Sequence, residues 1–207
     1  EMMNGLWATG RTAISGLVIA SLLGILLAVV MSQAKMIERA IFPYAVVLQA
    51  IPILAIVPLV GFWFGYSFMP RVFICVIISL FPIIVNTLFG LLSADKSQHE
   101  LFTLQGAGKW TRLTKLQFPA ALPNIFVGLR ISAGLAVIGA VVGDFYFRQG
   151  GVVGIGAQID VYRSRLWGAE LITAIIMASV LGLVVFLFFG WLSRRVIGKW
   201  HITTRGQ

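Results

Sequence analysis

Charged residues are scarce in this 207-residue chain, and acidic ones are the scarcest. Asp and Glu number 7 against 16 Lys and Arg, and together the four types make up 11% of the sequence, whereas a soluble domain carries about 25%. Hydrophobic residues make up 59%, and the mean hydropathy is +0.96. An ordinary soluble fold is therefore excluded, and the sequence predicts an all-α, polytopic membrane protein that forms one transmembrane domain over residues 1–207.

Cysteine is almost absent as well. Cys75 is the only one and lies in an apolar run, which excludes an intrachain disulfide and a Cys-based zinc site. His99 and His201 lie in polar segments without matching ligands, and no Ser or Cys nucleophile stands at a recognisable spacing from them. We predict no metal site and no catalytic residues, which disfavours an intramembrane enzyme because such an enzyme needs a catalytic constellation.

Long charge-free runs supply the predicted membrane spans. Three of them hold 23 residues, and at 1.5 Å per residue each would form a helix of roughly 34 Å, enough to cross a hydrocarbon core of about 30 Å. The second span contains several prolines and is expected to be kinked, with a short turn after it. The five predicted spans are 12–34, Pro43 to Phe64, 72–94, Ile125 to Phe147 and 171–193.

Small residues recur within two of these spans. Gly16, Ala20, Gly24 and Ala28 are spaced by four residues, and Gly139 and Gly143 repeat the pattern in the fourth span. Small residues at this spacing let helix backbones approach closely. We favour tight packing within one bundle over an interface that serves a subunit or a pathway.

Basic residues are distributed unevenly between the two sides that five alternating spans define. One side holds eleven Lys and Arg and the other five (Arg11, Arg71, Arg148, Arg163 and Arg165). Because Lys and Arg gather in cytoplasmic loops, the side with eleven is predicted to be cytoplasmic. Glu1 would then lie outside, and we expect a sixth span before it in the complete subunit. The eleven residues are Lys35, Arg39, Lys96, Lys109, Arg112, Lys115, Arg130, Arg194, Arg195, Lys199 and Arg205.

The segment 93–126 is a long polar stretch on that predicted cytoplasmic side. Its pattern indicates two short helices, Ser97 to Gln105 and Lys109 to Gln117, separated by a Gly106–Gly108 break that permits a sharp turn. The prolines that follow, Pro119 and Pro123, are expected to end the segment before the next span. An exposed amphipathic knob of this kind suits a groove on a soluble partner, although a helix lying on anionic lipid would have the same composition.

The same segment resembles the EAA loop of membrane permease subunits in binding-protein-dependent ABC importers, whose pattern is E-A-A, three residues, G, nine residues, I-x-L-P. Glu100 stands at the pattern's Glu, Gly106 six residues on, and Leu116 at the Ile position, while Phe118 and Pro119 stand at Leu-Pro. Leu101 and Phe102 replace the two alanines. Further stretches resemble the nitrate, sulfonate and taurine branch: Gln49 to Pro52, Phe64 and Gly65, Phe81 to Thr87, Pro119 to Pro123, and Gly128 to Arg130.

This resemblance implies a type I importer fold and a permease that works with partners. The implied assembly has two permease subunits, identical or homologous, two ATPase subunits that bind ATP and Mg, an external solute-binding protein, and a membrane-lipid surround, with no nucleic acid. No phosphate-binding G-x4-G-K-[ST] loop is present in the sequence, so this chain is expected to bind no cofactor. The implied coupling residues are Glu100, Leu101, Phe102, Leu104, Gly106, Ala107, Gly108, Lys109, Trp110, Arg112 and Pro119.

Polar residues inside the spans are candidates for the translocation pathway, since buried polar groups in lipid usually face a bundle interior or a pathway. They are Gln49, Asn86, Arg130 and Asp144. Alternative roles stay open: Asp144 could pair with a nearby Arg such as Arg148, Gln49 and Asn86 could bond backbone groups near Pro52 and Pro82, and Arg130 could snorkel to headgroups.

The segment 148–168 is predicted to lie outside the membrane. Ile155, Ile159, Tyr162 and Leu166 follow the spacing of an amphipathic helix, which would serve as a lid on the bundle or receive the solute-binding protein. The resemblance to importer permeases implies a permease of the cell inner membrane. The alternative is a self-sufficient channel or ion-coupled carrier, which is disfavoured because internal repeats are not visible and a carrier would not need the Gly106 turn.

Overall fold

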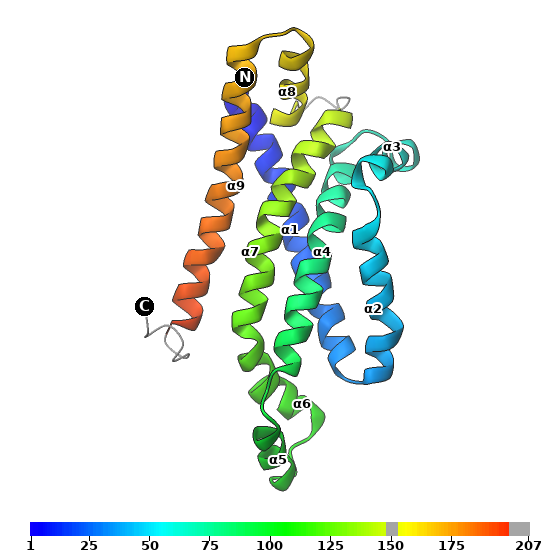
Figure 1. Cartoon of the computed structure of the whole chain (residues 1–207), viewed down its shortest axis with the longest axis vertical. Helices are drawn as coiled ribbons and strands as arrows, with labels where there is room; N and C mark the ends of the chain where they lie inside the picture. The colour runs from blue at the N-terminus through cyan, green and yellow to red at the C-terminus, as the bar shows by residue number, and fades with distance from the viewer. Residues whose placement is uncertain (148–152, 199–207) are drawn as a thin grey trace.

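The structure is a computed structural model that describes residues 1–147 and 153–198, and within these ranges it is built of helices. Four long helices, α1, α4, α7 and α9, run along the long axis of the molecule, with α8 at one end and α5 and α6 at the other (Figure 1). The elements are α1 (Met2–Ser32), α2 (Lys35–Ala50), α3 (Ile53–Phe64), α4 (Phe68–Leu92), α5 (Lys96–Leu104), α6 (Lys109–Arg112), the π-helical turn η1 (Leu113–Gln117), α7 (Phe118–Tyr146), α8 (Ile155–Ser164) and α9 (Gly168–Ile197).

The centre of the bundle is formed by α1, α4 and α7. A Cβ atom placed on Gly16 of α1 would collide with Cys75 of α4, and one on Gly24 would lie 2.8 Å from Ile83. Gly139 of α7 approaches Cys75 from the other side, where an added Cβ would lie 3.1 Å from the Cys75 Cα. The small residues therefore serve packing within one bundle, as the spacing predicted.

Four helical stretches are long and apolar enough to cross a membrane: α1, α4, the continuous Lys109–Tyr146 stretch and α9. The pair formed by α2 and α3 makes a fifth if it is counted as one span. Helix α9 lies at the edge of the bundle (Figure 1), and Ala174 is its buried residue. An apolar helix with so little protein around it presents its outer face to lipid.

The second predicted span differs from the structure. It is not one kinked helix from Pro43 to Phe64 but two helices bent by 96°. The break lies at Ile51 and Pro52, because the residue before a proline is driven to extended backbone, and Ile51 adopts φ −69° and ψ 126°. Residues 35–42, which lie between the first two predicted spans, form the first turns of α2, and Gln33 and Ala34 join α2 to α1.

The expected stop at Pro119 and Pro123 is also wrong. Pro119 lies in the first turn of α7, where its missing N–H is tolerated, and Pro123 lies inside the helix. The wider π-helical turn Leu113–Gln117 directly precedes α7. The predicted 93–126 segment therefore ends in a continuous helix, and α7 begins at Phe118 rather than Ile125.

At the opposite end, α8 confirms most of the predicted amphipathic helix. Ile155, Ile159 and Tyr162 are buried against α7, α9 and α1. Leu166 is an exception: it lies beyond the end of α8, is 90% exposed and has a positive φ of 57°. Residues 148–152 of the predicted outer segment lie outside the described residues.

Candidate functional site

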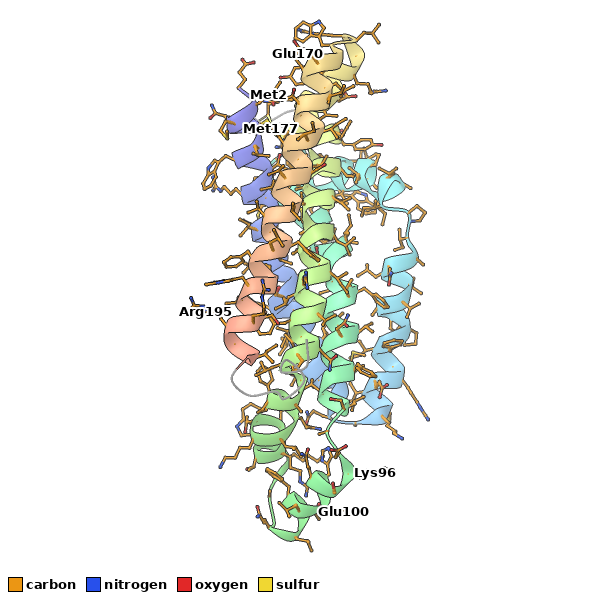
Figure 2. The ribbon with its side chains drawn as sticks, turned by 60° about the vertical axis from the view of Figure 1, so that its left-hand side comes forward. Met2, Lys96, Glu100, Glu170, Met177 and Arg195 are labelled. Carbon is orange, nitrogen blue, oxygen red and sulfur yellow. The ribbon has the colours of Figure 1, made fainter. Side chains whose placement is uncertain are left out.

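The short helices α5 and α6 form a bent projection at one end of the molecule. Figure 2 shows Lys96 and Glu100 on this projection, at the opposite end of the bundle from Met2 and Glu170. We call this projection, residues 96–112, the elbow. Its position beyond the ends of α4 and α9 separates it from the apolar part of the bundle (Figure 1).

A defined helix cap sets the bend of the elbow. Gly106 has φ +67°, in the left-handed region that favours glycine. Its N–H donates to the Thr103 carbonyl at 3.0 Å, and the next N–H, of Ala107, donates to Phe102 at 2.9 Å, which is the hydrogen-bond pair of a Schellman motif. The Nε of Arg112 then donates to the Ala107 carbonyl at 3.0 Å. Hydrogen bonds to residues before and after Gly106 thus stabilise the turn that the glycine break predicted.

The elbow exposes apolar side chains together with charges. Leu101, Leu104 and Trp110 are 55%, 87% and 74% exposed, although they lie on a polar segment. Of the predicted coupling residues, three are half-buried, namely Phe102, Ala107 and Arg112, and the others are exposed, namely Glu100, Leu101, Leu104, Gly106, Gly108, Lys109, Trp110 and Pro119. The structure brings all of these except Pro119 together on the elbow, and Pro119 begins the adjoining α7.

The second half of the predicted knob is anchored rather than free. Leu113 and Leu116 are 5% and 8% exposed, and Leu113 packs in a cluster with Leu91 and Ala121. The apolar residues of this half therefore divide in two: Trp110 is exposed, while the two leucines attach the elbow to the bundle. A displacement of the elbow would be transmitted to α4 and α7 through these contacts.

Gln49 and Asn86 lie in different surroundings. Gln49 is exposed at the end of α2 and lines a cleft of about 270 Å³ whose other walls, among them Ile78, Pro82 and Leu135, are apolar. Asn86 is half-buried where α4 meets α7, and its Nδ2 donates to the Pro82 carbonyl at 2.8 Å. The backbone bond considered for Asn86 is therefore present.

Asp144 belongs to a buried cluster at the end opposite the elbow. Its carboxylate lies 3.4 Å from Nη1 of Arg71 and accepts a hydrogen bond of 2.6 Å from Thr9. Arg71 also donates to the Phe147 carbonyl, and the N–H of Ile155, in the first turn of α8, donates to Thr9 Oγ1 at 2.8 Å. We call Thr9, Arg71, Asp144 and their two backbone partners the outer cluster. It ties α1, α4, α7 and α8 together.

The outer cluster gives Asp144 an arginine partner, as the sequence allowed, but on another helix. Arg148, the neighbour proposed from the sequence, lies outside the described residues, and Arg71 of α4 takes the role. Sequence reasoning missed Arg71 and Thr9 because they lie 73 and 135 positions away from Asp144. One signal was available in the sequence. Arg71 directly precedes one predicted span and Asp144 lies near the end of another, so the two opposite charges were expected at the same end of the bundle.

Arg130 faces α9 rather than Gln49 or Asn86. Its guanidinium lies over the Phe186 ring, with Cζ 4.0 Å from the centroid, and it lies against Gly190. The four polar candidates thus occupy separate positions. Among the residues that the structure describes, no group of three or more His, Cys, Asp or Glu side chains is placed to hold a metal ion.

Comparisons with known proteins fit this architecture. The family model described as "Binding-protein-dependent transport system inner membrane component" matches residues 20–198. Two solved structures share the fold: an amino acid ABC transporter with a TM-score of 0.74 at 20% identity, covering 94% of this chain and 93% of that one, and an inward-facing methionine ABC transporter with 0.71 at 19%, covering 94% and 95%. At these identities the two structures show the fold alone.

Two relatives of this chain are described as permease proteins of transport systems. The formylaminopyrimidine transport permease protein ThiX of Halalkalibacterium halodurans is 38% identical over 83% of this chain and 67% of its own length. The riboflavin transport system permease protein RibX of Chloroflexus aurantiacus is 31% identical over 82% and 62%. The chain thus spans about two thirds of the length of these relatives. The resemblance read from the elbow residues is confirmed, and the chain belongs to the family of inner-membrane components of binding-protein-dependent transport systems, the permease subunits of ABC importers.

Proposed function

We propose that this permease forms part of the translocation pathway for a small organic or inorganic solute and that its elbow docks into a separate ATPase subunit. The observation that carries the proposal is the elbow itself. Leu101, Leu104 and Trp110 are exposed on a rigid, charged turn beyond the membrane-spanning region. Exposed apolar anchors within a polar rim are typical of helices that insert into a groove on a partner protein.

The elbow is suited to transmitting motion. Helix α5, the first half of the elbow, contains no buried residue, so a partner can bind it without disturbing the packing of the bundle. Its continuation through Leu113 and Leu116 is packed into the bundle, and α7 follows without a break. Closure of an ATPase dimer around the elbow would therefore tilt α7 against its neighbours and switch the pathway between inward and outward access.

The proposed assembly follows from this role. Two ATPase subunits would bind ATP and Mg, a second permease, identical or homologous, would complete the pathway, and an external binding protein would deliver the solute. The elbow and the segment after α9 would lie in the cytoplasm, because Lys and Arg gather on that side of the sequence. Lipid would surround the spans in the cell inner membrane.

For the pathway, the structure supports Gln49 among the four candidates. Asn86 donates to the Pro82 carbonyl and does not line the Gln49 cleft. Gln49 lines the cleft between α2, α4 and α7 and places an amide in otherwise apolar walls, which is how polar groups orient a solute in such a cleft. The carboxylate of Asp144 is engaged with Arg71 and Thr9, and Arg130 is held against α9. We therefore leave Asn86, Asp144 and Arg130 out of the proposed pathway.

Gly106→Val tests the coupling role in the assembled transporter. A β-branched residue at φ +67° is strained by roughly 1–2 kcal/mol or more, so the turn should change shape and ATP hydrolysis should no longer drive uptake. ATPase rate and solute uptake would be measured together in reconstituted vesicles. Gly65→Val is the matched control, because Gly65 has a similar positive φ of 76° and open space for a side chain but lies outside the elbow.

Two outcomes would contradict the proposal. Equal coupling in the Gly106→Val and Gly65→Val transporters would remove the elbow from energy transmission. Uptake by this chain alone, without nucleotide or an ATPase subunit, would favour the channel or carrier.

A further inference from the structure

A second polar site lies far from the elbow's tip and from Gln49, in a cleft between α7 and α9. The cleft has a volume of about 320 Å³, and two of its lining residues are the cations Arg130 and Arg194. Among the described residues that line it, none is a carboxylate. Phe126 and Leu187 provide apolar walls on the two helices.

The geometry of Arg130 leaves its donors available. Phe186 lies against the face of the guanidinium, with Cζ 4.0 Å from the ring centroid, and stacking of this kind leaves the N–H groups at the edge of the plane. Gly190 makes room for this arrangement, because a Cβ there would already lie 3.5 Å from Cζ. Within residues 1–147 and 153–198, neither Arg130 nor Arg194 forms a salt bridge with a carboxylate.

The depth of the cleft places it at the level of lipid headgroups. Gly190 lies 20 residues after Glu170, about 30 Å along a helix at 1.5 Å per residue, which equals the thickness of a hydrocarbon core. Figure 2 shows Glu170 at one end of α9 and Arg195 near the other. Two cations close together at this depth have a charge that the described part of the bundle does not neutralise.

We propose that this cleft binds the phosphate of an anionic membrane lipid, with Arg130 and Arg194 as its ligands. Guanidinium groups match phosphate oxygens in bidentate geometry, and basic pockets between membrane helices suit acidic headgroups. The lipid source follows from the surroundings: Val127 and Leu187, 47% and 50% exposed, continue the cleft onto the outer surface of the bundle, where acyl chains lie. The lipid would fasten the otherwise lightly packed α9 to α7. This proposal does not depend on the elbow or on transport.

Native mass spectrometry of the purified transporter tests the proposal, with phosphatidylglycerol as the probe and phosphatidylcholine of the same acyl chains as the neutral comparison. In the double variant Arg130→Gln, Arg194→Gln, the dissociation constant for phosphatidylglycerol should rise on the order of tenfold or more, because each of the two cations near the membrane surface contributes roughly fivefold. Arg195→Gln is the control. Arg195 is the neighbouring cation, but its guanidinium lies over Trp191 and does not line the cleft, so binding should be unchanged.

A second variant, which keeps both arginines, tests the proposal if the double variant does not fold. Gly190→Leu fills the cleft while both cations remain and should also weaken phosphatidylglycerol binding. Gly182→Leu places the same bulk elsewhere on α9, near Val137, and should not. Unchanged phosphatidylglycerol binding in the double variant or in Gly190→Leu would overturn the proposal. Equal binding of phosphatidylcholine, or displacement of the lipid by millimolar inorganic phosphate, would overturn it too, the latter by showing a site for a soluble anion.

Discussion

Both ends of this permease contain charged residues, but these are buried at one end and exposed at the other. At the outer cluster, Arg71 and Asp144 are 4% and 1% exposed and are held by contacts from four helices. At the elbow, charged and apolar side chains are exposed to solvent, and α5 buries none of its residues. The difference teaches that the outer cluster contributes to the stability of the bundle, whereas the elbow is stable through its backbone cap and keeps its side chains free for a partner.

Asp144→Ala should give the largest effect, because it removes the carboxylate that neutralises a buried guanidinium. Breaking a buried ion pair in this way lowers the free energy of unfolding by about 3–5 kcal/mol. Thermal unfolding of the detergent-solubilised protein measures the loss. Glu170→Gln, an exposed carboxylate at the same end, should lower stability by less than about 1 kcal/mol. Equal losses in the two variants would show that burial does not distinguish them.

Gly16→Leu tests the close packing of α1 on α4. The added side chain would collide with Cys75 and the Val72 carbonyl, and overpacking of this kind lowers the free energy of unfolding by about 1–3 kcal/mol. The same unfolding experiment measures it. Gly134→Leu is the matched control, because an added Cβ at this position of α7 would meet no atom within 4 Å. A stable Gly16→Leu protein would mean that α1 and α4 separate more readily than their contact indicates.

Trp110→Ala should act on partner binding and not on folding. Truncating an exposed aromatic anchor weakens an interface by about 1–2 kcal/mol when it fills a pocket on the partner, while the unfolding temperature of the permease should stay the same. Affinity for the ATPase subunit is measured in nanodiscs. Trp63→Ala, which removes another exposed tryptophan, on α3, should leave that affinity unchanged. A fall in stability with Trp110→Ala and no fall in affinity would contradict the contrast between the two ends.

Glu100→Ala should change stability by less than about 0.5 kcal/mol, because Glu100 is exposed and a surface substitution of this kind has little effect. Its predicted effect is weaker binding of the ATPase subunit, measured in the same nanodisc assay. An unchanged affinity would remove Glu100 from the docking residues and leave the apolar anchors to carry the contact.

Sequence pattern predicted the spans well where one helix carries a continuous apolar run. The spans at 72–94 and 171–193 correspond to α4 and α9, and the Gly106 turn has the positive φ that the glycine break indicated. It failed where proline was involved. Pro52 separates two helices at 96°, while Pro119 and Pro123 are accommodated within a helix. Proline removes one donor in every case, and the surrounding packing decides whether the helix tolerates the loss.

By itself, the sequence determined that this chain is a membrane protein with about five spans and that a sharp turn follows Glu100. These features could be predicted because hydropathy, charge and the conformational freedom of glycine are local properties of the chain. Tertiary structure decided the rest. It paired Arg71 with Asp144, buried Leu113 and Leu116 while exposing Trp110, and set Arg130 and Arg194 on the same cleft. Each of these depends on which helix packs beside which, and that choice is made by the shape of whole helix faces rather than by any short stretch of residues.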